Sequence, residues 1–265
     1  MSLINVSNLT FSYEGSYDNI FENVSFQIDT DWKLGFIGRN GRGKTTFLNL
    51  LLGKYAYSGN ISSTVKFEYF PYDVEDKSLY TIEVMKSICT ECMDWEIFRE
   101  ISLLDVQEDA LYRPFNTLSN GEQTKVLLAA LFLTASCFLL IDEPTNHLDI
   151  DARNVVQNYL KRKKGFILVS HDRSLLDQCV DHILSINKTN IEIQKGNFTS
   201  WWENKTLQDN FELAENKKLL KEIGRLSYAA KRSSNWSNKV EKSKYGTTNS
   251  GSKLDKGYVG HKAAK

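Results

Sequence analysis

Apolar and polar positions alternate near the start of the chain with the period of two that is typical of strands burying one face. This pattern predicts strands at residues 4–11 and 24–28. Short apolar runs predict two more strands, at 34–37 and 65–70. Between these two runs, residues 45–52 have the periodicity of a helix and end before a glycine. The first part of the chain is therefore expected to be rich in strands.

The middle of the chain changes to helical periodicity. Residues 81–109 have a charged surface and predict an inserted helical subdomain over about 73–135. Residues 119–136 form a second clear helix with an apolar face. Residues 137–141 are wholly apolar, as expected of a strand buried on both faces of a parallel sheet.

A helix at 151–161 and an apolar strand at 166–169 continue the alternation of helices and strands. Such alternation favours an α/β fold. We expect one substantial α/β domain over residues 1–198, with a mixed sheet core, an antiparallel β subdomain and the helical subdomain.

Beyond Trp201 the pattern becomes that of a single amphipathic helix, predicted over 199–244. Its apolar residues recur three or four positions apart, at Leu219, Ile223, Leu226 and Ala230. From Tyr245 the chain is rich in Gly, Ser, Thr and Lys, which indicates a flexible tail. Residues 199–265 are thus expected to form a linker helix followed by this tail.

A net charge of zero hides a division of charge along the chain. Residues 217–265 hold 13 Lys and Arg against 3 Asp and Glu, whereas the first 216 residues hold 20 against 30. A basic extension on an acidic domain favours contact with a polyanion, and a basic helix carrying Trp236 suits ribosomal RNA. The alternative is an ordinary solvated linker helix. The cations along this helix include Lys217, Lys218, Lys221, Arg225, Lys231 and Arg232.

Composition excludes several classes of protein. The 265 residues suit one domain with an appendage. No apolar run of about 18 residues codes for a membrane helix, and the first residues lack the pattern of a secretory signal. Of four cysteines, Cys89 and Cys92 form a lone CxxC, which favours free thiols in a reducing, cytoplasmic setting.

Gly38 to Thr45 reads GRNGRGKT, between a predicted strand and a predicted helix. In that context the G-x-x-x-x-G-K-[ST] pattern indicates a phosphate-binding loop, whose backbone amides and helix N-terminus converge on phosphate oxygens. Lys44 is expected to lie between the β- and γ-phosphates of ATP, and Thr45 to offer a hydroxyl to Mg²⁺. The alternative is a glycine turn that happens to carry a lysine. The expected nucleotide-binding residues are Gly38, Asn40, Gly41, Gly43, Lys44, Thr45 and Thr46.

Two carboxylates follow the buried strand in the sequence CFLLIDE. Asp142 is expected near the metal ion and Glu143 beside the γ-phosphate, where it orients the attacking water. His171 follows the next buried strand, at the same sheet edge, and is predicted to hold the water and Glu143 in line. A chance acidic pair and a structural histidine are the alternatives.

The sequence LSNGEQ, residues 118–123, opens the second clear helix. Ser119 and Glu122 have the spacing of a capping box, which alone would account for them. Ser119 and Gly121 also present a hydroxyl and free amides at a positive helix end, which forms a second phosphate-binding surface. One nucleotide needs both surfaces only if two domains face each other.

The ordered motifs GRNGRGKT, LSNGEQ, LLIDEPTNHLD and VSHDR resemble those of ABC (ATP-binding cassette) ATPases, over residues 1 to about 200. The resemblance implies that Ser119 and Gly121 contact the γ-phosphate held by an opposite domain. It also implies that Asp149 sits at the seam between the domains and that Tyr13 stacks on adenine. Taken without the resemblance, Tyr13 is an unremarkable exposed aromatic.

Two positions depart from the family's pattern. Tyr72 stands where a glutamine usually serves the Mg²⁺ site, and a tyrosine cannot match an amide's paired donor and acceptor. Asn120 replaces the usual second glycine of the signature.

DEPTNHLD, followed by VSHDRSLLDQCVDHI and GNFTSWWENK, is similar to the ABC-F branch, above all to its antibiotic-resistance members of the Lsa and Vga type. That resemblance implies two tandem ATPase domains, a linker of paired helices, and binding to the ribosome and its RNA. It implies resistance to lincosamides, streptogramin A and pleuromutilins.

The chain covers one such domain and one linker helix, so we expect a truncated reading frame or an isolated half. Its partner would be the missing second domain or another copy of itself. Two other functions stay open: an ATPase subunit of a membrane transporter, and an inactive remnant.

Overall fold

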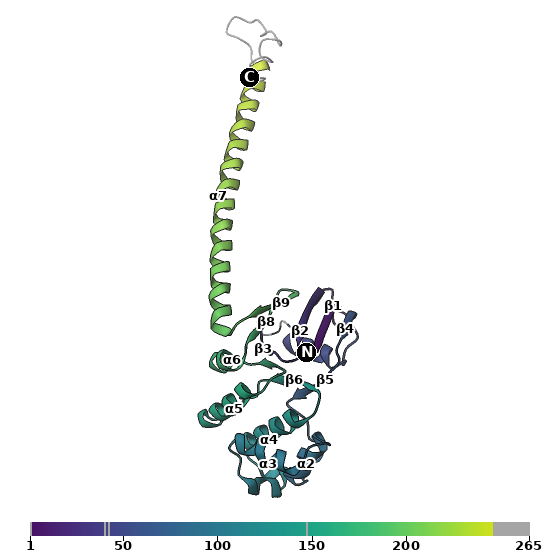
Figure 1. The fold of residues 1–265 in the computed structure, drawn as a ribbon. Helices are drawn as coiled ribbons and strands as arrows, with labels where there is room; N and C mark the ends of the chain where they lie inside the picture. Colours follow the sequence, from purple (N-terminus) through teal and green to yellow (C-terminus); the bar gives the residue numbers. More distant parts are fainter. Residues whose placement is uncertain (1, 40, 42, 147, 246–265) are drawn as a thin grey trace, which may run out of the picture. The chain divides into compact units, whose positions relative to one another are not determined.

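The computed structural model describes residues 2–39, 41, 43–146 and 148–245. Within this range the chain divides into two compact units, one ending at Trp202 and one beginning at Glu203 (Figure 1). The first unit holds two sheets and several short helices, and the second consists of the remainder of one long helix. The predicted limits of 1–198 and 199–265 stay a prediction.

The smaller sheet is antiparallel and confirms the predicted β subdomain. Its strands β1 (Leu3–Phe11), β2 (Phe21–Asp29) and β4 (Ser58–Ser62) lie in the order β2-β1-β4. The alternation that predicted β1 and β2 is visible in the buried side chains of Ile4, Val6 and Ile28. The sequence pattern gave no sign of β4, because its residues SGNIS are mostly exposed.

The larger sheet has the strand order β5-β6-β7-β3-β8-β9. The strands from β5 to β8 in this order run parallel, and β9 pairs antiparallel with β8, which gives the expected mixed α/β core. Parallel strands place their carboxyl ends at one edge, where ligands bind in open α/β sheets. The bounds are β3 (Lys33–Ile37), β5 (Lys66–Phe70), β6 (Cys137–Asp142), β7 (Phe166–Val169), β8 (His182–Asn187) and β9 (Asn190–Lys195).

Both faces of the larger sheet are covered, as the apolar run at 137–141 predicted. Leu139 and Ile141 of β6 pack into an apolar cluster with the helices α2 to α6. Phe138 and Leu140 point the other way, into a cluster with helix α1 (Lys44–Leu51) and the small sheet. Side chains of successive residues leave a strand on opposite faces, so a strand buried on both sides needs an unbroken apolar sequence.

The helical subdomain contains α2 (Thr81–Ile88), α3 (Asp94–Leu103), two short 3₁₀ turns and α4 (Asn120–Leu133), which lie together in Figure 1. The single helical run expected at 81–109 is in fact two helices. The break comes at residues 89–93, where a carboxylate oxygen of Glu96 accepts a hydrogen bond from the amide of Met93 at 2.9 Å and starts a new helix.

A buried carboxylate connects this subdomain to the sheet-covering helix α5 (Ile150–Arg162). Glu100 of α3 is 1% exposed and accepts a hydrogen bond from the Tyr159 hydroxyl at 2.6 Å. Lys163, which directly follows α5, pairs with the same carboxylate. Burial alone would raise the pKa of Glu100, but the bonds from Lys163 and Tyr159 hold this pKa below its ordinary value. Glu100 is therefore charged at neutral pH although its side chain is buried.

The first turn of helix α7 (Phe198–Tyr245) is attached to α6 (Arg173–Cys179). The carboxylate of Asp177 accepts hydrogen bonds from the amide and the hydroxyl of Thr199, both at 2.8 Å. The Arg173 guanidinium lies over the rings of Phe198 and Trp202, 5.6 and 5.3 Å from their centroids. The later part of α7 exposes its apolar side chains, including Leu219, Ile223 and Leu226.

Candidate active site

The loop between β3 and α1 is shaped by two glycines with left-handed backbone. Gly41 has φ 75° and Gly43 has φ 95°, which non-glycine residues adopt at a steric cost. A Cβ at Gly43 would lie 2.6 Å from Cγ2 of Ile20, so this position excludes a side chain on both grounds. The chain thus turns directly from the end of β3 into the N-terminus of α1, as the motif predicted. Asn40 lies outside the described residues.

Lys44 is the first residue of α1, and its Nζ donates a hydrogen bond to the carbonyl of Gly38 at 2.8 Å. This bond folds the ammonium group back over the loop. Burial lowers the pKa of Lys44, and the negative charges of Glu143 and Asp142 act against that shift. The lysine therefore brings a positive charge to the same sheet edge that holds the two carboxylates.

Asp142 is the last residue of β6, and its carboxylate accepts hydrogen bonds from two hydroxyls. Its Oδ2 accepts hydrogen bonds from Thr45 Oγ1 at 3.3 Å and from the Tyr69 hydroxyl at 3.1 Å. The approach of Thr45 and Asp142 fits a Mg²⁺ ion, which prefers hydroxyl, carboxylate and phosphate oxygens. The Tyr69 pKa is raised by burial and then by the charge and the hydrogen bond of Asp142, so the phenol stays protonated and donates.

Glu143 is held in an unusual position. Its backbone has φ 50°, and its amide donates to the carbonyl of Val169 at 2.9 Å. Oε2 accepts a long hydrogen bond from the amide of His171, at 3.4 Å. Oε1 is buried and, among the described residues, has no hydrogen-bond partner. A buried acceptor without a partner is costly, and strained backbone is concentrated at functional sites.

His171 approaches the same carboxylate, with its Nε2 3.5 Å from Oε1 of Glu143 and with a largely exposed ring. Burial raises the pKa of Glu143, while the neighbouring His171 and Lys44 act to lower it and Asp142 to raise it. A carboxylate with a raised pKa and a free acceptor atom can take a proton from a bound water. The structure thus brings Glu143 and His171 together, and the catalytic role of His171 stays a prediction.

Tyr13 extends from the end of β1 toward the phosphate-binding loop. Its hydroxyl shares a hydrogen bond with Thr46 Oγ1 at 2.8 Å, and the residue is 41% exposed. The ring meets those of Phe11 and Tyr55 edge-on, with centroids 5.1 and 5.8 Å away. An exposed ring held in place from one side can receive a flat ligand on the other.

Ser119 caps α4 as the capping box predicted. Its Oγ accepts from the amide of Glu122 at 3.2 Å, while the carboxylate of Glu122 accepts from the amide and hydroxyl of Ser119, both at 2.8 Å. Asp149 caps α5 in a similar way and accepts from the amide of Ala152 at 2.8 Å. Both helices therefore begin with ordered, positively polarised N-termini.

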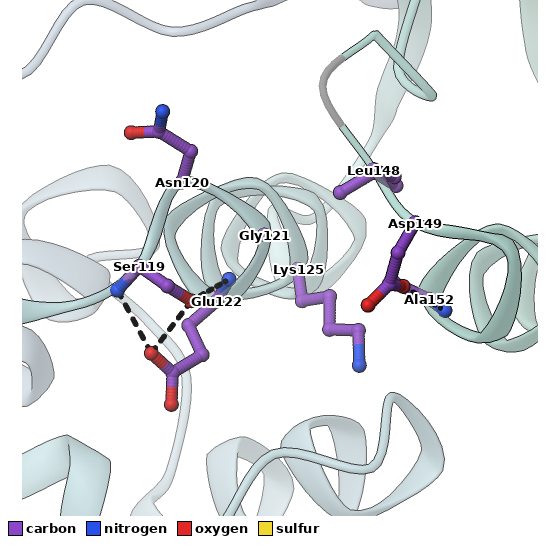
Figure 2. Close-up of a pocket in the computed structure, with 8 residues that line it drawn as sticks. All are labelled: Ser119, Asn120, Gly121, Glu122, Lys125, Leu148, Asp149 and Ala152. Carbon is purple, nitrogen blue, oxygen red and sulfur yellow. Dashed lines mark hydrogen bonds between the residues drawn. The ribbon is translucent and has the colours of Figure 1, made fainter.

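These two helix starts line one surface pocket of about 360 Å³, drawn in Figure 2. Ser119 and Gly121 come from α4, Asp149 from the start of α5, and Leu148 points toward Gly121. None of the described residues of the phosphate-binding loop contributes to this lining. The pocket is thus a second candidate site for phosphate, separate from the loop of the same chain.

Two residues of these sites were missed by the sequence reasoning. Lys125 lines the second pocket and could have been found, because it lies four residues after Gly121 on the same helix face. The hydroxyl of Tyr69 donates a hydrogen bond to Asp142, whereas the sequence motif singled out Tyr72 for the metal site. Tyr72 is half-buried and packs against the cluster of the helical subdomain. A role for Tyr72 in holding a metal ion stays a prediction.

Comparison with known proteins identifies a matching family and several similar proteins. Residues 21–146 match the sequence pattern of the ABC transporter family. The chain is 27% identical over 210 residues to ABC transporter F family member 5 of Arabidopsis thaliana, covering 76% of this chain and 30% of that protein. It is 31% identical over 201 residues to the ribosome protection protein VmlR of Bacillus subtilis, covering 72% and 35%.

The fold is also found in a solved structure of an ABC transporter of the metal-chelate type in an inward-facing conformation. The TM-score is 0.62 at 20% identity, over 74% of this chain and 84% of that one. The chain spans about a third of the length of the first curated relatives it matches. Among the described residues, no helix has the length and apolar character needed to cross a membrane.

Proposed function

We propose that this chain, which contains an ABC transporter ATPase domain and has ABC-F homologues, hydrolyses ATP at a site shared between two such domains. The observation that carries the proposal is the approach of Lys44, Asp142 and Glu143 at one sheet edge, where Oε1 of Glu143 accepts no hydrogen bond from the described residues and faces His171 Nε2 at 3.5 Å. The pocket of Ser119 and Gly121 supports the shared site, because it lies apart from the loop of its own chain.

Each side chain then has a distinct task. Lys44 and the loop amides bind the triphosphate, and Tyr13 stacks on the adenine. Thr45 and Asp142 would hold Mg²⁺, which when bound neutralises charge on the phosphates. Glu143 orients the attacking water and accepts its proton at Oε1, and His171 keeps that carboxylate in place. Ser119 and Gly121 of the second domain bind the γ-phosphate from the opposite side, with Asp149 at the seam.

Because each site needs two domains, ATPase activity per molecule is expected to rise steeply with protein concentration. At concentrations where the chain is monomeric the loop and the pocket cannot meet, so basal turnover stays low. Steady-state phosphate release across a dilution series, with the oligomeric state followed by light scattering, measures this. A rate per molecule that does not vary with concentration in a monomeric sample would contradict the shared site.

A mixing experiment provides the control. Lys44→Ala removes phosphate binding by the loop, and Gly121→Asp places a negative charge in the pocket, so each variant alone should be inactive. In a mixed pair, the loop of the Gly121→Asp copy meets the pocket of the Lys44→Ala copy and forms one intact site. Recovery of activity on mixing supports pairing, and a mixture as inactive as its parts counts against it.

At a finer level, we propose that the chain is the first half of an ABC-F protein of the Lsa and Vga type. Such a protein acts in the cytoplasm on the ribosome and gives resistance to lincosamides, streptogramin A and pleuromutilins. Similarity to VmlR, a ribosome protection protein, supports this reading. The exposed cations along α7 support contact with ribosomal RNA.

Binding of ribosomes is therefore expected to weaken as salt rises, by roughly 0.7 to 0.9 log units per phosphate contact for each tenfold increase. Co-sedimentation with purified ribosomes over a salt series gives this slope. A variant with four cations of α7 changed to Gln should flatten the slope. The four are Lys217, Lys218, Lys221 and Arg225.

The matched control changes four exposed lysines of the first unit to Gln and should leave the slope as in the wild type. A slope that is the same in both variants would rule out α7 as the RNA contact. These control positions are Lys66, Lys161, Lys188 and Lys195.

A further inference from the structure

Two hydroxyls meet at one oxygen of the metal-site carboxylate. Thr45 Oγ1 lies 3.3 Å and the Tyr69 hydroxyl 3.1 Å from Oδ2 of Asp142. Thr45 is expected to be a ligand of Mg²⁺ itself. When the ion is bound, its hydroxyl oxygen would contact the ion, and its hydrogen bond would no longer be needed to hold Asp142. Tyr69 is then the side chain of this pair that continues to hold Asp142.

The position of Tyr69 is set by the sheet. Tyr69 is the fourth residue of β5 and pairs with Leu140 of β6, two residues before Asp142. Its half-buried ring packs against the apolar cluster beneath the small sheet, and Nζ of Lys54 lies 5.6 Å from the ring centroid. The ring is thus supported along its length, with the hydroxyl at the carboxyl edge.

Tyr72 lies three residues after Tyr69, and its side chain packs in a different part of the domain. Pro71 ends β5, and the ring of Tyr72 packs against the other apolar cluster, that of the helical subdomain. Within the described part of the chain, the side-chain hydrogen bonds to Asp142 come from Thr45 and Tyr69. The chain therefore offers two tyrosines in one segment, of which one reaches the metal site.

We infer that Tyr69 is a positioning residue for metal binding: its hydroxyl fixes the carboxylate of Asp142 in the orientation that receives the Mg²⁺ of a bound nucleotide. The inference rests on the proposed function of the site. Groups that hydrogen-bond to metal ligands orient them, and their removal typically costs 10–100-fold in metal affinity. Tyr69 is then required for the metal, and the grip of the loop on phosphate does not depend on it.

The test compares Tyr69→Phe with Tyr57→Phe, which removes the same atom from another half-buried tyrosine of the same apolar cluster. Mn²⁺ serves as the probe, and its affinity for the complex of the full chain with ADP is measured by electron paramagnetic resonance. ADP affinity in EDTA is measured in parallel. We expect Tyr69→Phe to weaken Mn²⁺ binding by about 10–100-fold with unchanged ADP affinity in EDTA, and Tyr57→Phe to resemble the wild type.

Each other outcome has a clear meaning. Mn²⁺ binding by Tyr69→Phe at wild-type strength would overturn the inference, as would an equal loss in Tyr57→Phe. Loss of ADP affinity in EDTA in both Tyr69→Phe and Tyr69→Gln, which keeps a donor, would assign Tyr69 to the fold and overturn it too. If the wild-type chain bound no ADP at all, the proposed nucleotide site itself would have failed, which is a separate result.

Discussion

Changing Glu143 to Gln is expected to lower ATP turnover by about 10²–10⁴-fold while leaving ATP bound. The amide keeps the size of the side chain, and it can still contact the amide of His171. The amide cannot accept a proton from water, which is the task assigned to Oε1, an oxygen that accepts no hydrogen bond from the described residues. Single-turnover hydrolysis and equilibrium binding of a fluorescent nucleotide separate the two effects.

The pH profile tests the same assignment. Burial raises the pKa of Glu143, so wild-type activity should increase with pH as this carboxyl loses its proton, with an acid limb above the ordinary carboxyl range. The residual activity of Glu143→Gln should lack that limb. Glu192→Gln, a change at an exposed strand position, should match the wild type in both rate and profile. Normal hydrolysis by Glu143→Gln would show that another group is the base.

The parts of the fold that follow from local pattern were predictable. The strand at 137–141 had to be buried on both faces because it carries no polar residue, and the loop at 38–45 had to turn on Gly43, where a Cβ meets Ile20. The cap at Ser119 needs only residues three apart in sequence. Such features depend on neighbours along the chain and leave a clear sequence pattern.

Other features depend on partners far away in sequence. Strand β8 (His182–Asn187) joins the sheet beside β3, although its own apolar pattern is short. Tyr69 reaches Asp142 across 73 positions, and only the register of β5 against β6 brings their side chains together. The resemblance to the family's motif predicted a role for Tyr72, which stays a prediction. A motif marks positions in the sequence and does not indicate that the Tyr69 hydroxyl hydrogen-bonds Asp142.

The ion pair between Glu100 and Lys163 also joins residues that are far apart in sequence. No sequence pattern near residue 100 predicts a buried carboxylate. The pair joins α3 of the helical subdomain to the end of α5. These two parts carry the two halves of the second pocket, because α4 packs with α3 and Asp149 begins α5. The ion pair thus holds together the elements that present Ser119 and Asp149.

Changing Lys163 to Met is expected to lower the free energy of unfolding by about 1.5–3 kcal/mol, the range for a hydrogen bond to a charged group, because the buried carboxylate of Glu100 then keeps only the half-exposed Arg99 as its cation. Urea denaturation at neutral pH measures this loss. Lys164→Met, the same change at the exposed neighbouring residue, should stay within about 0.5 kcal/mol of the wild type. Equal losses from the two variants would contradict the role of the pair.

The pH dependence of the loss gives a second check with a definite sign. In the wild type the pKa of Glu100 is depressed, so the pair adds stability above the ordinary carboxyl pKa of about 4.3 and loses it as pH falls through the depressed value. Without Lys163 that pKa rises, so the gap between variant and wild type should narrow in acid. The double change Glu100→Leu with Lys163→Met removes the buried carboxylate together with Lys163 and leaves only Arg99, which is half-exposed. It should recover most of the loss, since an apolar replacement of a buried pair is often neutral.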